Sequence, residues 1–236
     1  MKVSVEPEFW TLFPDAQVNV LHLKGVKNQP ENHAYFEELL KNGAKEAQHF
    51  LTEETFSQNP VVAQWRQAFS QFKTKKGARS SIEALLKRVN QGHEFSPINP
   101  LVDIYNSISL KYAVPCGGED LKKIAGDLHL GKAIGGETFL PLGAEVDAPA
   151  LPEEIIYYDE KGAVCRCLNW REAQRTMLTD DTTEALLVIE AINEEQAQRA
   201  NQAMDEMQRL MENYFSISGS SQKLTADAPV FTIEEK

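Results

Sequence analysis

The sequence has few cysteines, no long apolar run and fewer basic than acidic residues. Three cysteines in 236 residues are too few for a disulfide framework, so we expect reduced thiols, as in the cytoplasm. No apolar stretch approaches the roughly 20 residues needed to cross a bilayer. The first ten residues, MKVSVEPEFW, lack the apolar core of a secretory signal. We therefore predict a cytoplasmic protein with no membrane partner.

Motifs for nucleotide, serine-hydrolase and metal chemistry are also absent. Gly117-Gly118 and Gly135-Gly136 fit neither GxGxxG nor GxxxxGK[ST], and there is no GxSxG elbow. Cys165-Arg166-Cys167 is a close cysteine pair, but a tetrahedral zinc site needs two more ligands, and the five histidines are scattered. We predict no cofactor and no metal, and we expect the cysteine pair to be small buried side chains.

Positive charge is scarce overall and concentrated in one block. The formal net charge is 24 minus 35, or −11, which argues against nucleic-acid binding over the whole surface and against DNA as a partner. Residues 64–93 carry a formal +6, whereas residues 137–236 carry 8 basic and 20 acidic residues, a formal −12. The basic block indicates either a local polyanion contact or two solvated helix faces. Its candidate RNA-binding residues are Lys73, Lys75, Lys76, Arg79, Lys87 and Arg88.

Five segments have the apolar spacing and start signals of helices. Asn59-Pro60 and Asn99-Pro100 each combine a capping residue with a first-turn proline. Ser80 and Glu83 have the spacing of a capping box, and Asn193 precedes two glutamates. The expected helices cover residues 31–51, with a possible break at Gly43, and residues 60–72, 80–91, 99–112 and 193–214.

Runs of β-branched and aromatic residues predict strands between these helices. Pro115 ends the fourth helix, and residues 116–121 are expected to form a polar corner, because two glycines free the backbone to turn. Residues 216–222 are expected to be a loop, followed by a tail. The fold class is α+β in one compact unit. The expected strands are residues 18–26, 137–142 and 184–192, with a hairpin over residues 153–170.

The stretch INPLVDIYNSISLKYAVPCGGEDL, residues 98–121, aims an amphipathic helix at the polar corner. Cys116 lies in this candidate site loop, and a nucleophilic thiol needs a base, which the sequence does not identify. We therefore expect Cys116 to line a pocket without reacting, with thiol catalysis as the alternative. Asp103 and Asn106 are expected to tie the helix to neighbouring backbone.

The same stretch, continued to Gly126, resembles the motif that opens the B3/B4 domain of the bacterial phenylalanyl-tRNA synthetase beta chain. Downstream, residues 136–139 resemble the Gly-Glu strand start of that domain, and residues 179–191 resemble its Thr-acidic-acidic-Thr segment and buried strand. The order and spacing of both segments make the match specific. The chain more closely resembles the free-standing proteins of this family, which carry an N-terminal extension like residues 1–95 and no synthetase catalytic domain. The matching positions of the first motif are Asn99, Pro100, Val102, Asp103, Asn106, Pro115 and Asp120.

The resemblance implies a single compact B3/B4-like domain, with a mixed or antiparallel sheet flanked by helices. It assigns residues 96–220 to this domain, residues 1–95 to an α/β N-terminal extension packed on it, and residues 221–236 to a C-terminal tail. It also implies hydrolysis in trans of the ester of mischarged tRNA, with the aminoacylated 3′ end as partner. The alternatives are a non-catalytic RNA-binding module and an enzyme or sensor for a free amino acid. The oligomeric state is left open.

The resemblance further implies a pocket, without naming a catalytic residue. Its walls would be residues 116–120 and 170–182, with Glu119 or Asp120 holding the substrate's α-ammonium. Gly117 stands where the synthetase has a histidine, and Gln174 stands nearest to the glutamate that recognises the tyrosine hydroxyl there. Arg171 and Gln174 are therefore expected to read the amino-acid side chain. The pocket residues are Asn106, Cys116, Gly117, Gly118, Glu119, Asp120, Trp170, Arg171, Gln174, Thr179 and Thr182.

Overall fold

The computed structural model describes residues 1–234. The α-helices are α1 (Pro7–Leu12), α2 (His33–Ala47), α3 (Pro60–Phe69), α4 (Ser81–Asn90), α5 (Pro100–Tyr112) and α6 (Glu194–Phe215). The first five strands are β1 (Lys2–Val5), β2 (Gln17–Lys24), β3 (Cys116–Asp120), β4 (Leu128–Lys132) and β5 (Ile155–Asp159). The other five are β6 (Gly162–Arg166), β7 (Arg171–Glu172), β8 (Glu184–Ala191), β9 (Ser220–Leu224) and β10 (Val230–Thr232).

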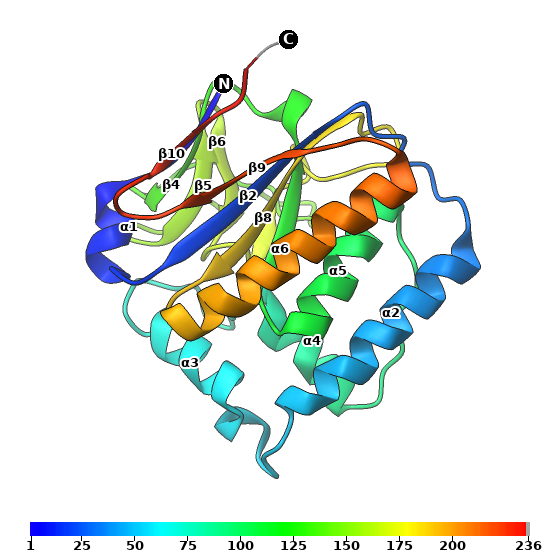
Figure 1. Cartoon of the computed structure of the whole chain (residues 1–236). Coiled ribbons are helices and arrows are strands. Elements are labelled where there is room, and N and C mark those ends of the chain that lie inside the picture. Colours follow the sequence, from blue (N-terminus) through cyan, green and yellow to red (C-terminus); the bar gives the residue numbers. More distant parts are fainter. Residues whose placement is uncertain (235–236) are drawn as a thin grey trace.

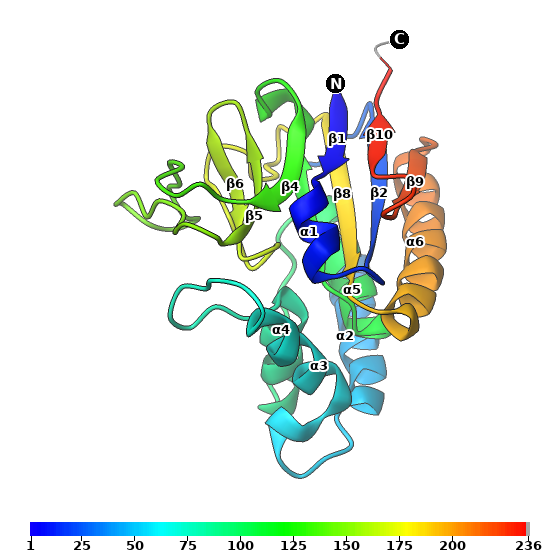
Figure 2. The ribbon, with the colours of Figure 1, turned by 90° about the vertical axis from the view of Figure 1, so that its left-hand side faces the viewer.

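These elements form two sheets and a helical layer (Figure 1). The first sheet has the strand order β10-β1-β4-β5-β6-β7, and the second has the order β3-β8-β2-β9. Strands β1 and β4 pair in parallel, and the neighbours that flank them pair antiparallel. Figure 2 shows β4, β5 and β6 of the first sheet on the left, β8 and β2 of the second sheet in the middle and α6 on the right. The predicted α+β class with a mixed sheet is confirmed.

The central strands of the second sheet are buried on both faces, and alternation sends their side chains into two cores. In β8, Leu186 and Val188 join the core shared with the first sheet, whereas Leu187 and Ile189 join the core under α5 and α6. Such strands read as continuous apolar runs, which is why EALLVIEAI is recognisable as a strand.

Three of the four predicted helix starts, Ser80, Asn99 and Asn193, are present as side-chain caps, whereas Asn59 precedes α3 without a side-chain cap hydrogen bond. The side chain of Ser80 accepts from the backbone N–H of Glu83, and that of Asn99 accepts from Val102. One detail of the prediction is wrong, because α2 does not break at Gly43. A Cβ at that position would lie 2.8 Å from the carbonyl oxygen of Ser107 in α5, so the glycine allows close packing of two helices.

Residues 116–120 are a strand, so the predicted polar corner is wrong. Strand β3 runs antiparallel to β8, with Gly117 opposite Val188 and Glu119 opposite Leu186. A Cβ on Gly118 would approach the side chain of Leu187 to 2.4 Å. The glycine therefore serves close packing rather than a turn. Low strand propensity is overridden here by pairing with a strongly β-forming neighbour.

Two other expectations about the sheets are wrong. Residues 137–142 form no strand, because Phe139 donates its backbone N–H to the carboxylate of Asp147 within the β4–β5 loop. The predicted loop and tail after residue 215 contribute β9 and β10, whereas residues 235–236 of that tail lie outside the described residues.

Strand pairing connects the three segments into which we divided the sequence. Strand β2, from the first segment, lies between β8 of the second and β9, which begins at Ser220 and runs into the third. Strand β1 pairs with β10. The domain boundaries at residues 95 and 220 stay a prediction. In the described residues, strands from all three segments pair within the same two sheets.

Candidate functional site

A cavity of about 450 Å³ lies where the edges of the two sheets approach each other. Its wall combines residues of β3, the edge strand of the second sheet, and of β7, the edge strand of the first. Helices α4 and α5 and the segment after β7 complete the wall. Ile98 and Leu142 belong to this wall and are 62% and 50% exposed, so they mark its opening.

The cavity brings together six of the predicted pocket residues. These residues come from segments 10 to 64 positions apart in the sequence, which meet because β3 and the β6–β7 region form neighbouring sheet edges. The six are Asn106, Cys116, Gly117, Gly118, Glu119 and Trp170.

Five predicted pocket residues do not line the cavity. Asp120 is buried and accepts from the hydroxyl of Thr182 at 3.0 Å, and this hydroxyl accepts from the backbone N–H of Thr179 at 2.9 Å. These three residues therefore fasten the turn after β7 to the end of β3. Gln174 donates its amide to the carbonyl oxygens of Pro141 and Ala144, and Arg171 lies 5.1 Å from the ring centre of Trp170.

Two glutamates that line the cavity are its main titratable groups. Glu119 is 7% exposed, and burial followed by repulsion from Glu172 raises its pKa well above the usual range. Burial alone raises the pKa of Glu172 to about 7. Cys165 lies opposite Glu172 in the β6–β7 pair, and its Sγ donates to Glu119 Oε1 at 3.0 Å. The two carboxyl groups therefore lie on one side of the cavity.

Asn169 offers an uncommitted donor in the same wall. Its Oδ1 accepts from the hydroxyl of Ser81 at 2.9 Å, while its Nδ2 is buried without a hydrogen-bond partner in residues 1–234. Its backbone N–H donates to Glu190 Oε1 at 3.1 Å, so hydrogen bonds fix both the backbone and the side chain of Asn169. A buried donor without a partner is costly, and it is common where a ligand supplies the partner.

Gly117 keeps the space in front of this amide open. A Cβ at Gly117 would lie 3.1 Å from Asn169 Nδ2 and 3.4 Å from its Cβ. The φ angle of Gly117 is not in the left-handed region. The glycine is therefore explained by the room that the Asn169 side chain needs.

Cys116 is part of the wall but is not an activated thiol. It is 5% exposed, its Sγ lies 3.8 Å from the carbonyl oxygen of Val114, and burial raises the pKa of the thiol. No histidine belongs to the described cavity wall. The residue thus lacks the base that a thiolate nucleophile requires.

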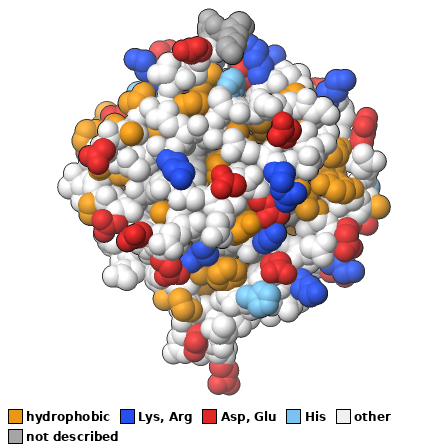
Figure 3. All heavy atoms as spheres, in the orientation of Figure 1, with side chains coloured by type: hydrophobic (Ala, Val, Ile, Leu, Met, Phe, Trp, Pro, Cys, Tyr) orange, Lys and Arg blue, Asp and Glu red, His pale blue; other side chains and the backbone are white. Residues whose placement is uncertain are grey.

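The predicted RNA-binding residues lie beside the cavity on α4 and on the loop before it. The loop carrying Lys73, Lys75, Lys76 and Arg79 joins α3 to α4 and projects on the same side as the β4–β5 loop (Figure 2). Lys87 and Arg88 lie in the last turn of α4, and Arg88 also lines the cavity. On the face shown in Figure 3, which carries α6, basic and acidic side chains alternate instead.

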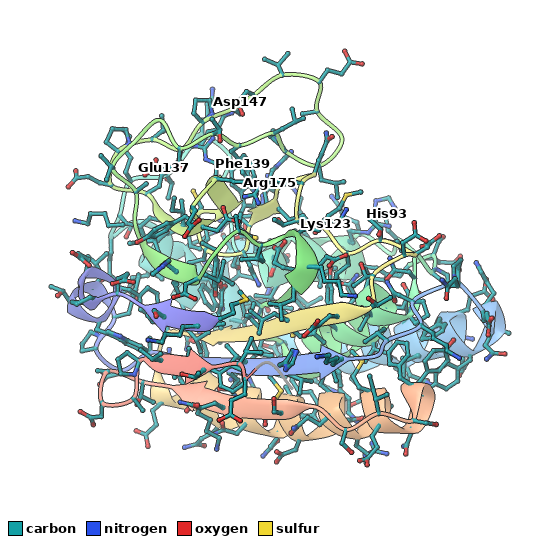
Figure 4. The ribbon with its side chains drawn as sticks, turned by 90° about the horizontal axis from the view of Figure 1, so that it is seen from above. His93, Lys123, Glu137, Phe139, Asp147 and Arg175 are labelled. Atoms are coloured by element: carbon teal, nitrogen blue, oxygen red, sulfur yellow. The ribbon has the colours of Figure 1, made fainter. Side chains whose placement is uncertain are left out.

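The β4–β5 loop, which supplies Leu142 to the wall, is fastened by its own polar side chains. Figure 4 shows Glu137, Phe139 and Asp147 on this loop, above the sheet. The carboxylate of Glu137 accepts from the backbone N–H groups of Ile134 and Gly135. A long loop held in this way is typical of binding and active sites.

Residues 1–234 contain no group of three His, Cys, Asp or Glu side chains positioned to hold a metal ion. In the same range, no helix has both the length and the apolar character required to span a membrane.

A family model described as "B3/4 domain" matches residues 64–221 of the chain, about two thirds of its length. The chain belongs to this family. The matched range contains the whole cavity wall, which runs from Ser81 to Leu178. A search of curated proteins finds no match.

The fold of this B3/4 protein is similar to a solved structure, an N-terminal fragment of the phenylalanyl-tRNA synthetase beta-subunit from Pyrococcus horikoshii. The TM-score is 0.50 at 11% sequence identity, and the match covers 93% of this chain and 49% of that chain. At this identity the similarity concerns the fold. The B3/4 protein spans about half of the length of the fragment.

Sequence reasoning placed the segment that contains Glu172 in the pocket wall without selecting this side chain, and it missed Asn169 as a cavity residue of the B3/4 protein. We expected Gln174 to contact the substrate, because it stands nearest to the glutamate position of the family. Instead, the two-residue strand β7 places Glu172 in the cavity wall. Gln174 donates its amide to the loop carbonyls of Pro141 and Ala144. Asn169 follows Cys167 and Leu168, which both have positive φ, at 50° and 57°. No sequence signal marks two consecutive non-glycine residues for that conformation.

Glu190 should make the stability of the B3/4 protein pH-dependent. Burial raises its pKa from 4.5 to about 8, despite hydrogen bonds from Tyr157 and from the backbone of Asn169. The raised pKa favours the protonated folded form, so this stabilisation is complete below about pH 4.5 and is lost as the pH rises through 8. Glu190→Gln, which stays neutral, should gain roughly 1 to 3 kcal/mol over the wild type between pH 5 and pH 9.

Thermal or urea unfolding at several pH values measures this gain. Glu38→Gln, on the exposed surface of α2, is the matched control and should run parallel to the wild type. A constant difference between Glu190→Gln and the wild type from pH 5 to pH 9 would show that Glu190 ionises normally in the folded protein.

Proposed function

We propose that this B3/4 protein hydrolyses the ester bond of mischarged aminoacyl-tRNA in trans. The observation that carries the proposal is a single cavity that combines buried carboxyl groups with an unpartnered amide donor, inside the family-matched range. An aminoacyl ester has a cationic α-ammonium and a carbonyl oxygen, which need an acid and a hydrogen-bond donor respectively. The basic residues beside the cavity suit the phosphates of the tRNA that carries the ester.

In this arrangement Asn169 binds the carbonyl oxygen and Glu172 the α-ammonium. A water molecule attacks the ester carbon, and the oxyanion that forms accepts from Asn169 Nδ2, a donor already in position and shielded by burial. Collapse breaks the bond to the ribose oxygen, which takes up a proton released by the attacking water through the neighbouring ribose hydroxyl. The second proton of the water is released to solvent, so the products are the free amino acid, as its carboxylate, and the uncharged tRNA.

A deacylation screen over mischarged tRNAs tests the proposal. Each tRNA carries a radiolabelled amino acid, and the release of label is followed with and without the protein. We expect rates well above spontaneous hydrolysis for a limited set of amino acids. If tRNA binds but no ester is cleaved faster than in buffer, the protein is a binding module and the hydrolase proposal fails.

Cys116 should be dispensable for this activity. Because the thiol is buried and no described histidine of the wall can activate it, Cys116→Ser should retain most of the deacylation rate, and no acyl-enzyme should accumulate. Rapid quenching followed by mass spectrometry of the intact protein measures the adduct. A trapped acyl group on Cys116 together with an inactive serine variant would instead identify a thiol esterase.

A further inference from the structure

The buried end of the cavity carries a carboxyl group that pairs with no basic side chain of the described residues. Glu119 Oε1 accepts from Cys165, and Oε2 is buried without a hydrogen bond in residues 1–234. The hydroxyl of Thr176 is a polar neighbour of the same carboxyl group. Glu172 lies opposite Cys165 across the β6–β7 pair. Two carboxyl groups therefore adjoin the same thiol, and one of them has a free oxygen in a closed environment.

Two arginines close to these acids, Arg175 and Arg88, have partners of their own. Arg175 donates to both carboxylate oxygens of Asp159 and to the carbonyl oxygen of Lys123, and it is seen beside Lys123 in Figure 4. Arg88 donates to the carbonyl oxygen of Glu94 and lies 5.1 Å from the ring centre of Phe95. No basic side chain of the described chain forms a hydrogen bond or an ion pair with Glu119 or Glu172. Arg175 acts on Glu119 only through its electrostatic field, so an ammonium group in direct contact with the two acids would come from a ligand.

The two acids differ in depth. Glu119 is 7% exposed, whereas Glu172 is half-buried and precedes the loop that follows β7. An amino acid attached to tRNA enters with its side chain first, since the ester and the ribose stay nearest to the opening. Glu172 is then the neighbour of the α-ammonium, and Glu119 is the neighbour of the end of the side chain.

We propose that the cavity selects amino acids whose side chain ends in a second ammonium group, which binds Glu119. This inference rests on the proposed function for the orientation of the substrate. An apolar side chain would leave both carboxyl groups without a contacting cation, and an acidic one would add a third carboxyl group beside them. A doubly charged ligand matches both acids. Its positive charge opposes the burial and repulsion that raise the pKa of Glu119.

Binding of small amides tests the selection without any hydrolysis. Lysinamide carries both ammonium groups and a carbonyl oxygen, and norleucinamide is its counterpart without the side-chain ammonium. By calorimetry at pH 7, lysinamide should bind at least about tenfold more tightly than norleucinamide to the wild type. Glu119→Gln should remove that difference, whereas Asp103→Asn, the same change at a buried acid outside the cavity wall, should preserve it.

Several results would overturn the selection. Equal or tighter binding of norleucinamide, no binding of either amide at millimolar concentration, or an unchanged preference in a folded Glu119→Gln variant would each do so. Circular dichroism and thermal unfolding establish that the variant is folded. If Glu119→Gln does not fold, lysinamide and norleucinamide on the wild type still decide the preference.

Hydrolysis of lysyl-tRNA and norleucyl-tRNA separates this inference from the proposed function. Faster cleavage of the lysyl ester supports both. Equal or faster cleavage of the norleucyl ester leaves the hydrolase proposal standing and refutes the side-chain preference. Cleavage of neither ester, with lysinamide still preferred in binding, refutes the hydrolase proposal and leaves the diamino-acid site.

Discussion

Asn169→Ala should lower the rate of ester hydrolysis by about 10²–10³-fold, the effect of removing one donor to a developing oxyanion. The reason is that Nδ2 of Asn169 is buried in the cavity wall without a partner, so it is available to the carbonyl oxygen of a bound ester. The loss should appear in kcat rather than in KM, because the contact strengthens as charge develops on that oxygen. Single-turnover deacylation of a mischarged tRNA measures it.

Ser81→Ala is the matched control for this prediction. Ser81 donates to Asn169 Oδ1 and orients the amide, so its removal should reduce the rate by a smaller factor, about tenfold or less. A folded Asn169→Ala variant with the wild-type rate would show that the amide does not contact the reacting carbonyl. The proposed geometry would then be wrong even if the hydrolase activity itself is present.

Reversing the charge of Lys75, Lys76 and Arg79 to glutamate should weaken tRNA binding at low salt by at least about 100-fold, or roughly 3 kcal/mol. The three side chains lie on the α3–α4 loop beside the cavity, within the block that carries most of the excess positive charge. Losing three phosphate contacts should also make the plot of log K against log salt shallower by about 2 to 3. Filter binding or anisotropy over a salt series measures both quantities.

A second triple variant controls for net charge. Lys27, Lys41 and Lys45 are exposed, on α2 and the segment before it. Their reversal to glutamate makes the same change in total charge, so it should weaken binding far less if the α3–α4 loop is the contact. Equal losses in the two triple variants would mean that the tRNA responds to overall charge and not to this loop.

Helices and buried strands were predictable because their signals are local. Asn99-Pro100 and Ser80 with Glu83 mark starts that the structure uses as caps, and EALLVIEAI is apolar enough to be recognised as an interior strand. Strand β3 was not predictable in this way. Its glycines suggest a turn, and only the presence of β8 alongside makes CGGED a strand.

For the candidate site, the sequence indicated two regions that line one cavity, but it did not indicate every side chain that faces it. Segments 116–119 and 170–178 do contribute to one cavity. Which side chains face it depends on a two-residue strand and on two residues with positive φ, and neither leaves a pattern in the sequence. Gln174 and Glu172 differ by only two positions, yet one holds a loop and the other lines the cavity.

The pairing of distant strands bears on how the chain reaches its folded state. Strand β2 pairs with β8 through Val18 and Glu190, and with β9 through Val18 and Leu224, so its partners are synthesised long after it. Met1 and Ile233 exchange backbone hydrogen bonds. During translation β2 therefore lacks both of its neighbouring strands, and its apolar side chains stay without their packing partners, until β8 and β9 have been synthesised. Contacts this remote in sequence predict slow folding and a period of dependence on chaperones.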